Sequence, residues 1–332
     1  MSTGTKQMDA VVMQAFGSPA QALAYRSEPV PEPGPDEVLV EVHAAGVNPL
    51  DVVIAAGVFG SPLPMIPGGD FAGIVVSGGA FAGQQVWGSA WAEGVGLGIT
   101  RPGTHARFVV LPERSLSRKP ERLTMAEAAA VGRSHLAAWH TVINTMDLQP
   151  GETILITGGA GMVGQAATAI ARWRGATPIV AGRRKPSGVE HFIDTSSGSG
   201  DLPEAVRELT DGRGADLALD IVGGALFEPT LRSLRFGGRM AATFNNLTRI
   251  EFSPGAEIVN KQLHVSGIAS IFWDAADITH VFDQLRPLFD RGLLPPPPVK
   301  TWPLANSADA YQTVLDGSAG IKQVLLPTAG KA

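Results

Sequence analysis

The feature that most constrains the fold is a strand, a glycine turn and a helix that follow one another near the middle of the chain. An apolar strand at 152–157 runs into a turn carrying Gly158, Gly161 and Gly164, and a helical segment at 162–174 follows. Small residues let the backbone approach a pyrophosphate, and free N–H groups at a helix N-terminus bind it. The glycine spacing departs from the strict dinucleotide fingerprint, so an ordinary glycine-rich turn is the alternative. The order of elements favours a nucleotide-binding loop.

Strands and helices alternate around this loop. Further strands are predicted at 177–181, 215–222, 238–244 and 264–269, and further helices at 126–145, 202–210 and 227–234. Thr124 and Glu127 fit a capping box at the start of the first of these helices. Alternation of β-branched apolar strands with helices is typical of a parallel sheet. We therefore predict an α/β, doubly wound Rossmann domain over residues 126–270.

The segments on either side of this domain have a different sequence pattern. Short β-branched runs separated by glycine and proline predict strands at 11–13, 37–43, 72–76, 85–87 and 106–110. The C-terminal part predicts helices at 274–291 and 307–315, extended prolines at 295–298 and a strand at 323–326. Many short strands joined by tight turns indicate a mostly antiparallel, barrel-like β domain.

The strand at 177–181 ends in Gly182, Arg183, Arg184 and Lys185. An NAD site commonly has a carboxylate at this point to hold the ribose hydroxyls, and here three cations follow instead. Arginine suits bidentate contact with phosphate, so the turn indicates a 2′-phosphate and NADP(H) as cofactor. A solvated basic turn is the alternative.

Composition removes several classes of function. The chain has no cysteine, which excludes disulfides, thiol catalysis and thiolate metal sites. Its seven histidines lack the short spacing of a helical metal pair, so no metal is expected. A net charge of −5 without a dense Lys/Arg run argues against nucleic acid or anionic membranes as partners and leaves a small molecule. The polar N-terminus and the lack of a run of about 18 apolar residues predict a cytoplasmic protein without a membrane span.

Short blocks spread over nearly the whole chain form a second pattern. They include Gly46 to Asp51, Leu63 to Gly73, Gly103 to Ala106, Pro150 to Thr153, Asp220 to Gly223 and Lys322 to Pro327. Together with the glycine loop they closely resemble the zinc-free quinone oxidoreductases (zeta-crystallin-like) of the medium-chain dehydrogenase/reductase superfamily. The resemblance implies a GroES-like catalytic domain of residues 1–125 and 271–332, with the Rossmann domain between them and the active site in the cleft.

The resemblance also implies catalytic residues. Asn48 stands where zinc-dependent members have a cysteine, and family members use this asparagine near the nicotinamide; initiation of a turn is its alternative. Tyrosines common in the family are replaced, at Val53 and Phe59 among other positions. Arg133 and His135 are therefore candidates to polarise a substrate oxygen. A packed helix residue is the alternative for His135, and binding of the cofactor pyrophosphate is the alternative for Arg133.

The remaining implied site residues fall in two groups. The candidates for cofactor binding are Asn48, Gly158, Ala160, Gly161, Met162, Val163, Gly182, Arg183, Arg184, Lys185, Val222, Phe244, Asn245 and Lys322. The candidates for the substrate pocket are Phe59, Trp91, Phe272 and Trp273, with Trp87 beside them and core packing as the alternative for the aromatics. The loop 94–103 is a candidate lid.

These patterns predict an enzyme that moves hydride from NADPH to a quinone or another conjugated carbonyl without zinc. An enone reductase, acting on the carbon–carbon double bond, is the main alternative, and a simple carbonyl reductase follows it. A crystallin-like protein that binds the cofactor with little turnover is the alternative from another class. The strand at 264–269 is expected at the edge of the sheet, where it would pair with its twin in a homodimer.

Overall fold

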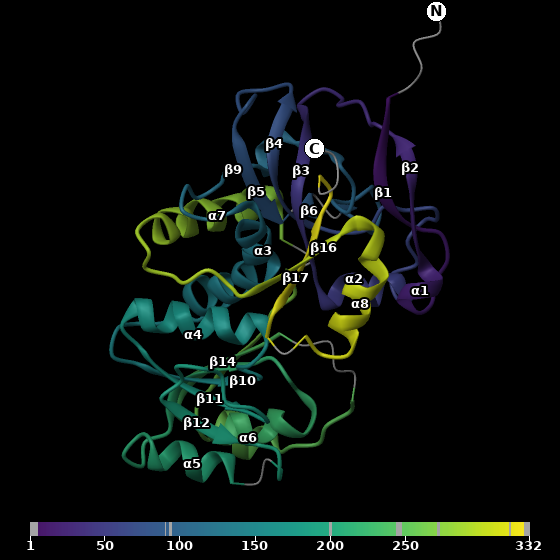
Figure 1. Cartoon of the computed structure of the whole chain (residues 1–332). Coiled ribbons are helices and arrows are strands. Elements are labelled where there is room, and N and C mark those ends of the chain that lie inside the picture. Colours follow the sequence, from purple (N-terminus) through teal and green to yellow (C-terminus); the bar gives the residue numbers. More distant parts are fainter. Residues whose placement is uncertain are drawn as a thin grey trace, which may run out of the picture. The chain divides into compact units, whose positions relative to one another are not determined.

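The computed structural model describes residues 6–89, 91–92, 95–198, 201–243, 248–270, 273–318 and 320–328. The chain divides into two compact units, shown in Figure 1. Unit 1 comprises Met1–Leu136 and Ile271–Ala332, and unit 2 comprises Ala137–Ser270. Among the described residues, no helix combines the length and apolar character needed to cross a membrane.

Unit 2 is built on a six-stranded sheet in which all neighbouring strands are parallel, so the predicted Rossmann architecture is confirmed. The strand order is β12-β11-β10-β13-β14-β15. The strands are β10 (Thr153–Thr157), β11 (Thr177–Gly182), β12 (His191–Asp194), β13 (Ala215–Asp220), β14 (Leu234–Ala242) and β15 (His264–Gly267). Helix α4 (Met162–Arg174) covers one face, and α5 (Leu202–Glu208) and α6 (Phe227–Arg232) cover the other (Figure 1).

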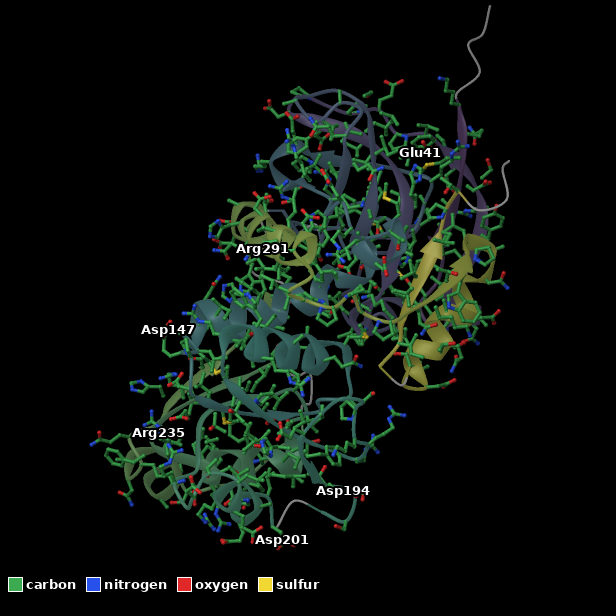
Figure 2. All side chains as sticks on the ribbon, turned by 60° about the vertical axis from the view of Figure 1, so that its left-hand side comes forward. Glu41, Asp147, Asp194, Asp201, Arg235 and Arg291 are labelled. Carbon is green, nitrogen blue, oxygen red and sulfur yellow. The ribbon has the colours of Figure 1, made fainter. Side chains whose placement is uncertain are left out.

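The centre of this sheet is buried on both faces. Every residue of β10 and of β13 is buried, and most residues of both strands are apolar although β13 carries Asp216 and Asp220. Strand β12 was not predicted, because its four residues are polar or only half-buried and carry no apolar run. Acidic residues outside the core, such as Asp147, Asp194 and Asp201, are exposed (Figure 2).

Unit 1 contains a seven-stranded, mostly antiparallel sheet, in agreement with the predicted GroES-like domain. Its path is β16-β17-β3-β4-β5-β9, and β8 also pairs with β3. The strands are β3 (Glu37–Val47), β4 (Asp70–Ser77), β5 (Gln85–Ser89), β8 (Phe108–Pro112), β9 (Ser117–Arg118), β16 (Val299–Pro303) and β17 (Lys322–Leu326). Two ribbons complete the strands: β1 (Gln7–Met13) with β2 (Leu23–Pro29), and β6 (Trp91–Ala92) with β7 (Val95–Gly96).

Helices pack on this sheet and close its core. They are α1 (Pro19–Ala22), α2 (Pro49–Ala55), α3 (Met125–Trp139), α7 (Ala275–Asp290) and α8 (Ser307–Leu315). The indole of Trp87 on β5 is fully buried and meets the rings of Phe282 and Phe289 on α7 edge to face, at centroid distances of 5.0 and 6.0 Å. Trp87 is therefore a core residue, and the prediction that it helps to hold a flat substrate was wrong.

The segment proposed as a lid is packed where it is described. Leu97 and Ile99 are buried, and a Cβ on Gly103 would lie 2.2 Å from the carbonyl oxygen of Gly68. Residues 95–103 therefore form a fixed part of unit 1 rather than a loose loop, while Gly94 lies outside the described residues.

Candidate active site

Three side chains and one main-chain N–H, from distant parts of the chain, form a buried polar cluster in unit 1. The Nδ2 of Asn48 donates to Oδ2 of Asp70 at 2.8 Å, and the Nζ of Lys322 donates to the same oxygen at 3.1 Å. Lys322 also donates to Oδ1 of Asn48. The main-chain N–H of Arg133 donates to the other carboxylate oxygen of Asp70 at 3.0 Å. We call Asn48, Asp70, Lys322 and Arg133 the Asp70 cluster.

Sheet topology brings these residues together. Strand β3 is antiparallel to both β4 and β17, so its carboxyl end meets the beginnings of those two strands. Asn48 follows the last residue of β3, Asp70 is the first residue of β4, and Lys322 is the first residue of β17. Gly46 on β3 pairs with Asp70, and a Cβ there would lie 2.8 Å from Cε of Lys322. The glycine thus makes room for the lysine stem beside the carboxylate.

Arg133 reaches the cluster through a break in helix α3. Gly132 has φ 24° and ψ −136°, values outside the helical region, and a Cβ on it would lie 2.2 Å from Oδ2 of Asp70. The break frees the N–H of Arg133, which Asp70 accepts in the manner of a helix N-cap. The helix predicted at 126–145 is therefore not continuous: α3 is broken at Gly132 and is followed by a π-helix, His140–Thr145. Its predicted capping box is confirmed, since Glu127 N–H donates to Oγ1 of Thr124 at 3.2 Å and Thr124 N–H donates back at 2.8 Å.

The protein holds Asp70 in its ionised form. Burial alone would raise the pKa of Asp70, but the charges of Lys322 and Arg133 and the hydrogen bond from Asn48 hold it below its usual value. Burial raises the pKa of the neighbouring Asp51, against the opposing charge of Arg133 and the hydrogen bond from the main chain of Asn48. The pKa values of these two neighbouring buried carboxyl groups are thus shifted in opposite directions. Asp51 accepts the main-chain N–H of Asn48 at 2.7 Å, and so it braces the start of α2.

A buried histidine–tyrosine pair supports the strand that carries Asn48. His105 has Nε2 at 3.3 Å from the carbonyl oxygen of Gly46, so this nitrogen carries the proton. Nδ1 then accepts from the hydroxyl of Tyr311 at 2.9 Å. Burial lowers the pKa of His105 and raises that of Tyr311 well above its usual value, so both groups are neutral near pH 7. The pair fixes the backbone at Gly46.

His135, a predicted catalytic residue, lies in the second half of α3. Its Nδ1 donates to the carbonyl of Val131 at 3.2 Å, and its ring packs on Phe289 at 5.6 Å. Burial lowers the pKa of His135 to about 4. The imidazole is therefore neutral near pH 7. Its single N–H is given to Val131, so Nε2 can accept a hydrogen bond and the ring cannot act as a cationic acid. A catalytic role for His135 stays a prediction.

The glycine loop of unit 2 fits a dinucleotide pyrophosphate. Gly158 adopts φ 65°, and a Cβ on Gly159 would lie 2.3 Å from Cγ1 of Val180. A Cβ on Gly164 would lie 2.5 Å from Cα of Gly159, so the loop and α4 approach more closely than larger residues would allow. Gly161, the N-cap of α4, is exposed, and the first N–H groups of the helix have no acceptor within it. The candidate Ala160 lies in this turn, Met162 and Val163 lie in the first turn of α4, and all three are half-buried.

The ends of β10 and β13 support the same loop. Asp220 is fully buried, and one of its oxygens accepts from Oγ1 of Thr157 at 2.6 Å and from the N–H groups of Val222 and Gly223 at 3.0 Å. A Cβ on Gly158 would lie 3.0 Å from the side chain of Val222, which is partly exposed. Val222 therefore lies beside the glycine loop, and its contact with a cofactor stays a prediction.

The predicted basic turn is exposed at the carboxyl end of β11. Arg183, Arg184 and Lys185 are all exposed and follow Gly182, the last residue of the strand. The sequence reading missed Asp194, which pairs with Gly182 across the neighbouring strand β12. Its carboxylate accepts the N–H of Ser196 at 2.8 Å, and this bond lowers its pKa. The turn thus offers three cations and one carboxylate.

The other predicted positions are less informative. Phe59 is half-buried in the turn after α2, and Trp273 is half-buried before α7. Trp91 lies in β6, and nothing is described of its side chain; Phe244, Asn245 and Phe272 lie outside the described residues. Within the described part of the chain, no three His, Asp or Glu side chains are grouped so that they could hold a metal ion.

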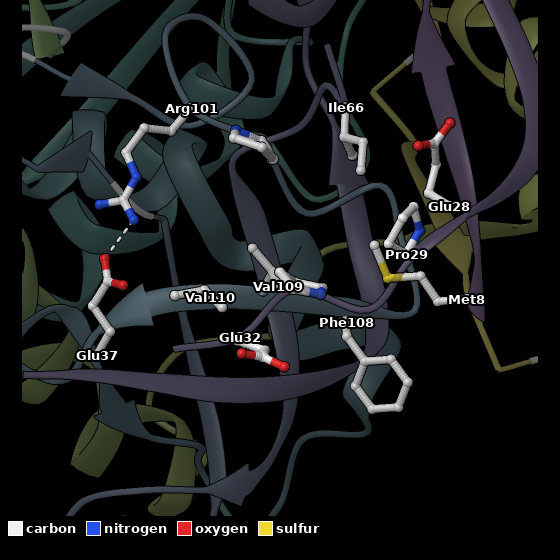
Figure 3. A pocket seen from close by; sticks show the side chains of 13 residues that line it. Met8, Glu28, Pro29, Glu32, Glu37, Ile66, Arg101, Phe108, Val109 and Val110 are labelled. Carbon is white, nitrogen blue, oxygen red and sulfur yellow. Dashed lines mark hydrogen bonds and ion pairs between the residues drawn. The ribbon is translucent and has the colours of Figure 1, made fainter. Parts of the chain in front are cut away.

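A cavity of about 340 Å³ in unit 1 involves none of the predicted site residues (Figure 3). Met8, Ile66 and Phe108 contribute apolar lining, and an ion pair between Arg101 and Glu37 lies at its edge. Sequence reasoning gave no signal for this cavity, because its lining comes from six separate segments. The Asp70 cluster remains the stronger candidate for chemistry, since it combines burial, opposite charges and free hydrogen-bond donors.

Comparison with known proteins gives concordant results. A family model described as the alcohol dehydrogenase GroES-like domain matches residues 34–121, and one described as zinc-binding dehydrogenase matches residues 162–286. Human quinone oxidoreductase is 27% identical over 338 residues, covering 98% of this chain and 99% of the relative. A zinc-type alcohol dehydrogenase-like protein of Schizosaccharomyces pombe, C337.11, is 30% identical over 271 residues and 80% of each chain. The crystal structure of AibC superposes with a TM-score of 0.86 at 29% identity, over 97% of this chain and 96% of that one.

Proposed function

The chain belongs to the medium-chain dehydrogenase/reductase superfamily, and we propose that it is an NADPH-dependent reductase of quinones or other conjugated carbonyls that works without zinc. The full-length similarity to a quinone oxidoreductase supports the substrate class. The observation that carries the proposal is the Asp70 cluster, a buried group of hydrogen-bond donors held around one ionised carboxylate.

The donor set of this cluster argues against a catalytic zinc. The ammonium of Lys322 contacts both the amide oxygen of Asn48 and the carboxylate of Asp70, the two oxygens that a cation would need. A divalent ion there would face the charge of Lys322 at close range and that of Arg133 nearby. The chain also has no cysteine to supply a thiolate. Reduction of a conjugated acceptor needs no Lewis acid of this kind, because charge delocalises onto its oxygen.

The residues present fit a bound NADP(H). The glycine loop would hold the pyrophosphate, and Arg183 and Arg184 would contact the 2′-phosphate. When bound, the reduced cofactor supplies the hydride. The protein's part is to orient the acceptor, exclude water and stabilise the negative charge that develops on its oxygen. The donors of Asn48 and Lys322 are suited to that last task.

The cofactor preference is tested by reversing the charge of the basic turn. The double variant Arg183→Glu/Arg184→Glu should weaken NADPH binding about tenfold to a hundredfold, since a hydrogen bond to a charged group contributes about 1.5–3 kcal/mol. NADH binding should change little, because NADH lacks the 2′-phosphate. Equal weakening of both cofactors, measured by fluorescence titration, would refute the assignment and leave a solvated turn.

The reaction is tested by following oxidation of NADPH with a quinone, an enone and a plain ketone. The proposal expects turnover of the quinone or the enone, little with the ketone, and weak turnover with NADH. Turnover of the enone alone would select the double-bond reductase. Binding of NADPH without oxidation by any acceptor would favour the crystallin-like, cofactor-binding protein.

We also propose that the protein is a homodimer joined through β15. This strand lies at the edge of the six-stranded sheet, and Val265 within it is 40% exposed. An exposed edge strand presents unpaired N–H and C=O groups to which a second copy of the same strand can add.

A further inference from the structure

The ammonium of Lys322 has one hydrogen-bond donor to spare. Its side chain is 3% exposed, and two of its three N–H groups go to Asn48 and Asp70. Within the described part of the chain, no acceptor contacts the third. The amide of Asn48 likewise gives one N–H to Asp70 and keeps the other. Both nitrogens contact the same carboxylate oxygen, at 3.1 and 2.8 Å, so the nitrogen atoms that carry the two remaining N–H groups are neighbours.

The lysine is held in place along its length. Its main-chain N–H donates to the carbonyl of Pro298 at 2.8 Å. Its stem passes Gly46, at which any larger residue would collide with Cε. A side chain fixed at both ends loses little freedom when a ligand contacts it, which is the condition for a preorganised donor.

The charges around the lysine favour an anion. Lys322 and Arg133 are both close to Asp70, which their charge keeps ionised, whereas burial pushes Asp51 toward its neutral form. The two cations thus lie beside one carboxylate that they hold ionised, and an incoming oxyanion would add a second counter-charge.

We propose that Lys322 is a catalytic residue whose free N–H hydrogen-bonds to the carbonyl oxygen of the acceptor and then gives that oxygen a proton; this rests on the reaction proposed above. Hydride arrives at the conjugated carbon with its electron pair and forms a C–H bond. The π electrons shift to the oxygen, so the acceptor is reduced. The oxygen then takes a proton from the ammonium: an N–H bond breaks, an O–H bond forms, and water later returns the proton to the amine.

The test compares Lys322→Met and Lys322→Arg with a matched control. Lys119→Met makes the same change at another buried lysine of unit 1, whose ammonium only caps the carbonyls of Pro120 and Leu123. Lys322→Met should lower kcat about 10²- to 10⁴-fold, the usual contribution of a general acid, with a smaller change in KM. Lys322→Arg should restore part of kcat, since arginine supplies the hydrogen bond and charge but does not release its proton. Lys119→Met should keep kcat even if it lowers stability.

A second readout does not depend on turnover. The probe is p-nitrophenol, whose phenolate absorbs in the visible range, added to the full-length protein with NADP⁺. In the wild type and in Lys119→Met, bound probe should ionise at a lower pH than free probe. In Lys322→Met this shift should disappear, and in Lys322→Arg it should remain.

The outcomes separate the two proposals. If Lys322→Met is folded, keeps kcat within about threefold and ionises the probe as the wild type does, the role of Lys322 is refuted while the reductase stands. If the wild type reduces no acceptor but its shift of the probe is lost in Lys322→Met, the proposed reaction fails and the oxyanion site stands.

Discussion

Replacing Asp70 by asparagine should destabilise unit 1 severely although the side chain keeps its size. The carboxylate is fully buried and accepts on both oxygens, from Asn48 and Lys322 on one and from Arg133 on the other. An amide has one oxygen. In one orientation its NH₂ faces the N–H of Arg133, and in the other it faces both side-chain donors. Asp70→Asn therefore leaves at least one buried donor unsatisfied and two cations without their counter-charge.

The magnitude follows from these losses. Removing one partner of a buried ion pair costs about 3–5 kcal/mol. Asp216→Asn in unit 2 is the control, because Asp216 also pairs with an arginine, Arg235, whose side chain is 34% exposed. Solvent screens that pair, so its loss should cost about 1 kcal/mol.

The assay is urea unfolding followed by circular dichroism, with two transitions allowed because the chain has two units. Asp70→Asn should strongly lower the urea midpoint of the unit 1 transition, and Asp216→Asn should slightly lower that of the unit 2 transition. The folded pKa of Asp70 is below its usual value, so its contribution is present above about pH 4 and is lost as pH falls further. The reasoning is refuted if Asp70→Asn stays within about 1 kcal/mol of the wild type at pH 7.

Three further outcomes are expected. Below pH 6.5 His135 takes up a proton in the unfolded chain, whereas in the folded chain its pKa is about 4, so the free energy of unfolding should fall as pH drops through this window. His135→Gln should therefore flatten the slope of the urea midpoint against pH. An unchanged slope would contradict the burial of a neutral imidazole. Gly159→Ala should lower the free energy of unfolding by about 1–3 kcal/mol, because its Cβ would press on β11. Gly255→Ala, with open space around it, should change the free energy of unfolding by less than about 0.5 kcal/mol in the same assay. Val265→Lys should convert the dimer to a monomer in light scattering; a protein that is monomeric before the substitution would refute pairing through β15.

The sequence predicts those parts of the fold that depend on local pattern. Strand periodicity, helix periodicity and the glycine turn are each recognised from residues that are close together in the sequence. The limits of β10, α4 and β11 are therefore within one residue of the predicted ones. Strand β16 was missed because it follows a run of prolines and pairs only with distant β17. Strand β12 was missed because half-exposed polar residues give no signal of burial.

The candidate site could be predicted only in part, because its contacts are not local. Asn48 and Lys322 were each identified from short blocks, but 274 positions separate them, and no local pattern shows that they touch. At the break in α3, Gly132 lies against Asp70, which belongs to the distant strand β4, and no local pattern shows this approach. Asp70 itself stood in a recognised block and was not assigned a role, since a single aspartate after two glycines looks like a turn.

Removal of bound metal ions decides whether the protein reduces its acceptor with NADPH and no metal. The purified protein is treated exhaustively with a chelator, its metal content is determined, and the rate of NADPH oxidation with the best conjugated acceptor is measured before and after treatment. We expect the same kcat/KM for the metal-free and untreated protein, with no gain when zinc is added. Loss of activity on chelation and its return with zinc would show that the reaction needs the metal.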